Sequence, residues 1–179
     1  LFVERGGTLL TPRADLGLLP GVLRRSLLDA GRAAEADLTL DDLAALRITV
    51  FAAYPYLYDG DAAYEAAYLA EYAAAPDAVL VAAFDADRIV GAATAAPMMQ
   101  QKPEFRAPFD ALALDVSRLF YFGESVLLPD YRGAGVGHAF FDLREAQARA
   151  CGAKAACFAA VLREPDHPAR PADYVPLDG

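Results

Sequence analysis

Hydrophobic and polar positions change their spacing along the chain, and the clearest pattern lies in its last third. Residues 119–128 are almost continuously apolar and rich in aromatic and β-branched side chains, which predicts a buried strand. Apolar side chains then recur at helical spacing over 136–150, and 155–161 is a second apolar run. We therefore expect a strand, a helix and a second strand that runs parallel to the first.

Two helical patterns precede this unit. From Thr39, a sequence that resembles a capping box leads into apolar residues three or four positions apart, and Pro55 and Gly60 break the pattern. Asp61 can cap a second helix. That helix places tyrosines on one face at four-residue steps: Tyr64, Tyr68 and Tyr72.

The stretch between these helices and the strand at 119–128 completes the pattern. Residues 78–84 and 88–94 predict an antiparallel hairpin. Residues 98–118 are polar and interrupted by proline, which predicts a loop with one short helical piece near 104–112. We expect this loop to act as a lid. The order of the elements predicts an α/β domain with a mixed sheet covered by helices.

Composition and charge narrow the choice of partners. The chain has 179 residues, of which 56% are apolar, but alanine inflates this share and no apolar run approaches the ~20 residues that span a bilayer. It has two cysteines, no Cys-x-x-Cys motif and no evident secretory signal, so we expect reduced thiols in the cytoplasm. The net charge of -9 disfavours nucleic acid or an anionic membrane as a partner and suits a cationic substrate.

The turn at 131–138 is rich in glycine. Its glycines allow backbone N–H groups to point into one concavity, and the start of the next helix adds the positive end of its dipole, which predicts an anion site. A Walker loop is excluded, since no lysine follows. A dinucleotide fingerprint would place His138 where its last glycine belongs. The remaining pattern, R-x-x-G-x-G, is matched by Arg132, Gly135 and Gly137.

Together with the preceding strand, which ends in Leu-Leu-Pro, this turn resembles the pyrophosphate-binding turn of the GNAT superfamily of acyl-CoA N-acyltransferases. The resemblance covers roughly residues 41–161. It implies a GNAT-like fold, in which helices flank a central mixed sheet, and transfer of an acetyl group from acetyl-CoA to a primary amine by direct attack. It also implies a bulge in the strand 119–128 that exposes backbone groups to the cofactor. The implied cofactor-binding residues are Val126, Leu127, Leu128, Arg132, Gly133, Ala134, Gly135, Val136, Gly137 and His138.

The resemblance also bears on the ends of the chain. It places the first strand near 31–37, where the composition is poor for a strand, and 8–11 is the alternative. Residues 16–28 have the pattern of a helix. We expect a poorly defined segment over 1–38 and one acyltransferase domain over 39–179. Since the chain closes without an obvious finishing element, we expect this domain to be truncated at its C-terminus.

Glu124 is the one side chain within the strand 119–128 that is charged at neutral pH. Without a partner, a carboxyl there would be desolvated, and desolvation raises the pKa of a carboxyl toward that of a general base. The resemblance implies such a base, which takes the proton from the amine, often through water. The alternative is that Glu124 lies on the outer face of the strand or caps a neighbouring helix.

The resemblance further implies a tyrosine, beyond the last strand, that protonates the leaving thiolate. Tyr174 is the only tyrosine after Val161, but it lies among prolines rather than in a helix. Packing is therefore its favoured role, and solvent is the alternative acid. Cys157 is expected to be an inert buried thiol. The chain has two histidines, too few for a metal site.

A tyrosine-rich loop is the candidate acceptor site. Tyr54, Tyr56, Tyr58 and Asp59 combine aromatic rings with a carboxylate, which suits an ammonium group. The alternative is that the rings pack a junction between helices. The expected partner is a small-molecule amine, and a homodimer stays open. The competing function is a CoA-binding regulatory module or pseudoenzyme without turnover.

Overall fold

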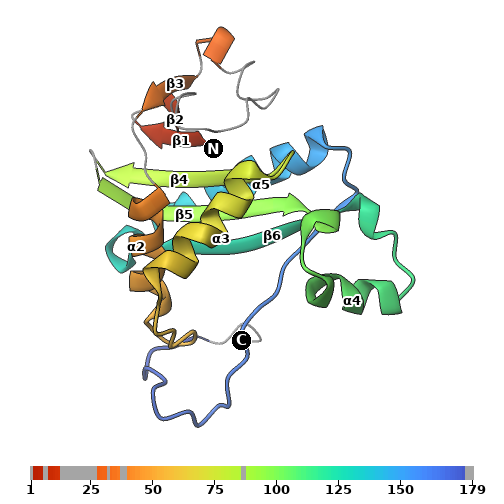
Figure 1. Ribbon diagram of the computed structural model, residues 1–179. Helices are drawn as coiled ribbons and strands as arrows, with labels where there is room; N and C mark the ends of the chain where they lie inside the picture. The colour runs from red at the N-terminus through yellow and green to blue at the C-terminus, as the bar shows by residue number, and fades with distance from the viewer. Residues whose placement is uncertain are drawn as a thin grey trace.

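The computed structural model of the protein describes most of the chain, over residues 2–5, 8–12, 28–31, 33–36, 40–85 and 88–175. The strands of these described residues form one mixed sheet in the order β3-β2-β1-β4-β5-β6-β7 (Figure 1). The predicted hairpin is present as β4 (Val79–Asp85) and β5 (Arg88–Pro97), and β6 (Leu119–Leu127) pairs antiparallel with β5. The predicted mixed sheet is confirmed.

Helices cover both faces of the sheet. Alternate residues of β4 point to opposite sides, so Leu80 and Val81 belong to different core clusters. Helices α2 (Leu40–Phe51) and α3 (Ala62–Ala74) pack on one face, and α5 (Val136–Ala150) packs on the other (Figure 1). Because both faces are buried, the central strands are continuous apolar runs rather than alternating ones.

Helices α2 and α3 end where the sequence predicts. Helix α2 stops at Phe51, ahead of Pro55. Helix α3 follows Asp61, whose side chain accepts a hydrogen bond from the backbone N–H of Tyr64 at 2.7 Å. It stops before Pro76, so the predicted cap and the predicted terminus are both confirmed.

The predicted loop at 98–118 contains one helix, α4 (Pro103–Ala111), between two short 3-10 turns. Helix α4 buries none of its residues and projects away from the sheet (Figure 1). The short helical piece is therefore confirmed. That the segment acts as a lid stays a prediction.

The strand, helix and strand at the end of the domain form the predicted parallel crossover. Strand β7 (Ala155–Cys157) runs parallel to β6, with Leu119 opposite Ala155 and Tyr121 opposite Cys157. It is shorter than the predicted 155–161, because the chain leaves the sheet after Cys157. A bulge in β6 just beyond the paired part bends that strand, which accounts for the early separation.

The N-terminal strands extend the sheet past β4. Strand β1 (Phe2–Arg5) pairs parallel with β4, β2 (Thr8–Pro12) is antiparallel to β1, and β3 (Ala33–Ala36) is parallel to β2. Both candidate positions for the first strand are therefore strands. The helix expected at 16–28 lies, apart from Leu28, outside the described residues. In the described part of the chain, no helix has the length and apolarity needed to cross a membrane.

Candidate active site

Strand β6 carries the implied bulge opposite Thr94. The register of β5 and β6 shifts there, so that Thr94 faces both Gly123 and Glu124. A Cβ on Gly123 would collide with Oγ1 of Thr94 and lie 3.0 Å from the hydroxyl of Tyr72. This close approach requires glycine, and the bulge redirects the side chain that follows it.

Arg144 of α5 supports the bulge from the opposite face of the sheet. Its buried guanidinium donates to the carbonyls of Glu124 and Thr94, at 3.3 and 3.5 Å. It also lies over the rings of Phe122 and Phe141. Burial lowers the pKa of Arg144 to about 10, although the Glu124 carboxylate acts in the opposite direction.

Glu124 is held by two partners. Its side chain, 10% exposed, forms an ion pair with Arg47 of α2, and the hydroxyl of Tyr68 donates to its Oε2 at 2.9 Å. Arg47 forms a second ion pair with Glu65 of α3. The desolvation of Glu124 was expected for a carboxyl without a partner, whereas the carboxyl in the structure has two partners. Glu124 is instead the end of a charged network that joins two helices to the bulge.

Arg47 and Glu65 are site residues that the sequence reasoning missed. Arg47 is 6% exposed and Glu65 is 1% exposed. The guanidinium of Arg47 lies 4.4 Å from the ring centre of Tyr68. On α2, Arg47 lies four positions after the buried Leu43. On α3, Glu65 lies four positions before the buried Leu69. A charge at such a core-facing position must be paired inside the fold, and that pattern is the signal that identifies them.

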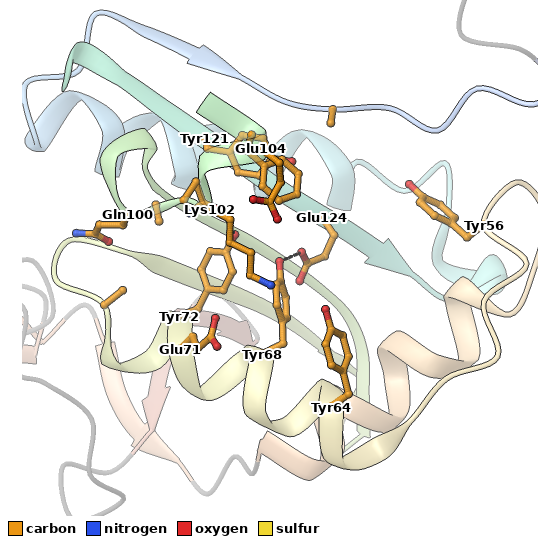
Figure 2. A pocket seen from close by; sticks show the side chains of 16 residues that line it. Tyr56, Tyr64, Tyr68, Glu71, Tyr72, Gln100, Lys102, Glu104, Tyr121 and Glu124 are labelled. Atoms are coloured by element: carbon orange, nitrogen blue, oxygen red, sulfur yellow. Dashed lines mark hydrogen bonds between the residues drawn. The ribbon is translucent and has the colours of Figure 1, made fainter. Parts of the chain in front are cut away.

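A cavity of about 410 Å³ opens beside Glu124, between α3, β6 and the segment that leads into α4 (Figure 2). Figure 2 shows the hydroxyl of Tyr68 and the carboxylate of Glu124 meeting across it. Its titratable lining consists of tyrosines, three carboxylates and one ammonium group, so acidic groups outnumber basic ones. These residues are Tyr56, Tyr64, Tyr68, Tyr72, Tyr121, Glu71, Glu104, Glu124 and Lys102.

Four tyrosines of the cavity stay protonated at neutral pH. Burial raises the pKa of Tyr68, Tyr72 and Tyr56, and it raises that of Tyr121 to about 12. The negative charge of Glu124 acts in the same direction on all four. The rings therefore offer neutral hydroxyls that donate hydrogen bonds, together with π faces that attract a cation.

The structure brings one of the four predicted acceptor residues to the cavity. Tyr56 lines it, whereas Tyr54, Tyr58 and Asp59 do not. Tyr58 packs against the core cluster beneath α2 and α3. Tyr54 packs edge-on against Tyr174, with ring centres 4.7 Å apart. Tyr174 likewise does not line the cavity, and this contact agrees with the packing role.

Two glycines of the turn have left-handed backbone conformations. Gly133 and Gly135 have φ values of 77° and 85°, and Gly135 is the N-cap of α5. No atom within 4 Å would meet a Cβ on either glycine, so the space in front of the turn is open. Tyr131 donates to a carboxylate oxygen of Asp85 at 2.6 Å, which ties the turn to the end of β4.

The outer edge of β6 leads from the bulge to this turn. The described residues include no strand beside it after Tyr121, where the pairing with β7 ends. Leu128 donates its N–H to Val90 of β5, so by alternation the backbone groups of Leu127 point to the outer side. There the carbonyl of Leu127 accepts a hydrogen bond from Arg132 at 3.3 Å. An extended ligand can pair with this edge as a strand would.

Two family models match the chain. The acetyltransferase (GNAT) family matches residues 44–172, and amino-transferase class IV matches residues 1–53. The two matches overlap at residues 44–53, and the amino-transferase match covers less than a third of the chain. A comparison with curated protein sequences found no match.

Solved structures with the same fold include enzymes and a regulator. Aminoglycoside 6'-N-acetyltransferase AAC(6')-IG from Acinetobacter haemolyticus has a TM-score of 0.54 at 15% identity, over 71% of this chain and 77% of that one. AAC(6')-Iy in complex with CoA has a TM-score of 0.52 at 16% identity, over 71% and 72%. A transcriptional regulator from Bacillus halodurans C-125 has a TM-score of 0.51 at 11% identity, over 72% and 79%. At these identities the likeness establishes the fold.

Proposed function

Since the chain belongs to the acetyltransferase (GNAT) family, we propose that it transfers an acetyl group from acetyl-CoA to a primary amine of a small, cationic acceptor. One observation carries the proposal: Glu124 lies where an acidic cavity meets the open edge of β6. Gly123 and Glu124 on β6 and Ala159 beyond β7 all line the cavity, so it reaches the fork between the two strands.

The fork and the turn are the proposed cofactor site. Backbone N–H groups between Arg132 and His138 bind the pyrophosphate, aided by the positive end of the α5 dipole. The pantetheine arm lies along β6 at Val126–Leu128, where amide groups of the arm pair with backbone groups of the strand. AAC(6')-Iy, which has the same fold, binds CoA, and this supports acetyl-CoA as the donor.

Glu124 is the proposed general base. It takes a proton from the ammonium group of the acceptor, directly or through a water, and leaves a neutral amine. The amine attacks the thioester carbonyl and a C–N bond forms. The attacking nitrogen loses its second proton to solvent, the C–S bond breaks, and the CoA thiolate leaves. Because Tyr174 packs against Tyr54 outside the cavity, we assign protonation of the thiolate to solvent.

The acceptor class follows from the cavity lining. Three carboxylates against one ammonium favour a ligand with positive charge, and tyrosine faces bind cations. The volume of about 410 Å³ suits a small molecule. Of the acceptor residues predicted from the sequence, we therefore propose only Tyr56. We add Tyr64, Tyr68 and Tyr72 of α3 to the proposed acceptor site.

The domain boundary, the cellular location and the oligomeric state stay predictions. We propose that 39–179 is the acetyltransferase domain. We propose that it acts in the cytoplasm, and a homodimer stays open.

One observation favours a second function, that of a CoA-binding module without turnover. Both carboxylate oxygens of Glu124 are engaged, one by Arg47 and the other by Tyr68. A carboxylate with two partners has less capacity to accept a proton from a substrate than a free one.

The two functions are separated by measuring free thiol while acetyl-CoA is incubated with a panel of amines. We use tyramine, putrescine, spermidine and neamine, each with and without the protein, and measure CoA affinity by calorimetry in parallel. Release of CoA that depends on both the protein and one of the amines supports the acetyltransferase. Binding of CoA with no release across the panel supports the module.

A further inference from the structure

The chain that follows β7 packs against the tyrosine loop. We call residues 158–175 the C-terminal strap and residues 52–60 the tyrosine loop. In Figure 1 the strap runs from β7 to the connection between α2 and α3, where the tyrosine loop lies. Arg163 of the strap donates from Nε to the carbonyl of Pro55 at 2.7 Å and from a terminal nitrogen to the carbonyl of Tyr56 at 2.8 Å.

Aromatic contacts reinforce this attachment. Tyr54 of the tyrosine loop packs edge-on against Tyr174, and its ring centre lies 5.7 Å from that of His167. Within the strap, Arg170 donates to the carbonyl of Pro165 at 2.8 Å and lies over the ring of Tyr174. The strap is therefore folded on itself as well as attached to the loop.

The tyrosine loop connects this attachment to the acceptor cavity. Tyr56 lines the cavity, and its ring lies 4.5 Å from that of Phe51, centre to centre. The guanidinium of Arg47, which pairs with Glu124, also lies over the ring of Phe51. Tyr56, one of the two residues whose carbonyls accept hydrogen bonds from Arg163, thus also lines the cavity.

We infer that Arg163 is a positioning residue for the acceptor cavity, and that the C-terminal strap sets acceptor affinity through Tyr56. The inference rests on the proposed function. A guanidinium presents Nε and a terminal nitrogen as a rigid fork, which matches two successive carbonyls, whereas the ammonium of lysine is a single point of donation. Among the described residues, both hydrogen bonds of Arg163 go to the tyrosine loop and neither reaches the turn 131–138, so we expect the cofactor site to be unaffected by its loss.

The kinetic test compares Arg163→Ala with the wild type, using the amine of the panel above that is acetylated fastest. Loss of charged hydrogen bonds to the loop raises KM for the amine about tenfold, while kcat and KM for acetyl-CoA stay within about twofold. Arg163→Lys recovers part of the loss. Arg149→Ala, which removes an exposed arginine paired within α5, is the matched control and changes nothing. An equal rise in KM for the amine and in KM for acetyl-CoA would overturn the assignment of Arg163 as a positioning residue.

A double-mutant cycle separates positioning from general loss of structure. If Arg163 acts through Tyr56, then Tyr56→Ala and Arg163→Ala have strongly non-additive effects on KM for the amine. Additive effects would mean that Arg163 acts by another route, and the inference would fail.

Hydrogen exchange tests the same contact without turnover. In Arg163→Ala, residues 52–60 exchange faster than in the wild type while α5 is unchanged. Unchanged exchange in the tyrosine loop overturns the inference whether or not any amine is acetylated. Faster exchange together with no acetylation by the wild type would instead reject the proposed function and leave the attachment of the strap intact.

Discussion

Glu124 illustrates how a single side chain depends on partners from other elements. Its position on β6 gives it access to the cavity, Arg47 supplies a fixed positive charge, and Tyr68 supplies a donor. Because Arg47 also pairs with Glu65, removal of one carboxylate leaves the guanidinium with the other. A variant that lacks one of the two carboxylates should therefore still fold, and its activity can be measured.

At neutral pH, Glu124→Gln should reduce turnover by about 10²- to 10⁴-fold, the usual contribution of general-base catalysis. Turnover should recover partly at high pH, where an alkyl amine with a pKa near ~10 loses its own proton. The CoA affinity, measured by calorimetry, should stay constant. Wild-type rates in this variant at pH 7 would remove Glu124 from the mechanism.

Arg47→Met should destabilise the fold strongly. It leaves Glu65 and Glu124 as buried carboxylates without their shared cation, and breaking a buried ion pair from one side typically costs ~3–5 kcal/mol. Urea unfolding measures this change. Arg149→Met, at an exposed pair with Glu145, should shift the midpoint little, because surface pairs contribute about 0–1 kcal/mol. Equal midpoints for the two variants would contradict the role of Arg47.

At the scale of elements, the turn before α5 is the part whose function depends on backbone conformation. Gly135→Val should abolish CoA binding, since a β-branched residue resists positive φ and its side chain occupies the open space in front of the turn. Calorimetry checks this expectation.

Gly152→Val is the control for that variant. Gly152 also has a positive φ, 75°, and open space around it, but it lies at the other end of α5. It should reduce stability by a similar amount and leave CoA affinity unchanged. If the two variants bind CoA equally well, the pyrophosphate lies elsewhere.

Elements whose signals are local were predictable from the sequence. The cap at Asp61, the hairpin of β4 and β5 and the crossover through α5 follow from neighbouring residues and their spacing. The length of β7 was not predictable, because residues 158–161 are as apolar as the strand itself. Their departure from the sheet depends on the bulge in β6, which is a property of the pairing between two strands.

The candidate site was predictable in part for the same reason. The turn and Glu124 lie within one continuous sequence pattern, so their proximity follows from the crossover. The tyrosine face of α3 was visible as a pattern, yet nothing local indicates that it faces Glu124 rather than the core. The network of Arg47 and Glu65 joins helices far apart from β6 in sequence, and only the folded arrangement brings their charges together.

At the scale of the whole molecule, the buried tyrosines predict a loss of stability at alkaline pH. The folded-state pKa of Tyr121 is raised from 10.0 to about 12, so its contribution is fully present below pH 10 and is lost as pH rises through 12. The raised pKa values of Tyr56, Tyr68 and Tyr72 act in the same direction. Arg144 opposes them, because burial lowers its pKa to about 10 and the unfolded state then binds more protons.

Several tyrosines outweigh one arginine, so the urea midpoint should fall between about pH 10 and about pH 12. Tyr121→Phe removes one of the titrating hydroxyls and should make the fall shallower. A midpoint that is constant over this range, or equally steep in the variant, would contradict the assignment of these groups.

The parallel pairing of β1 with β4 has a consequence for how the protein behaves when shortened. Strand β1 occupies the hydrogen-bonding edge of β4 at Val81–Ala83. Without residues 1–38, that edge is a bare, apolar template to which another chain can add, and such edges promote self-association. A shortened protein should therefore form larger particles in light scattering at concentrations where the full chain does not. A monodisperse monomer would show that β4 tolerates an exposed edge, and that the N-terminal strands protect nothing.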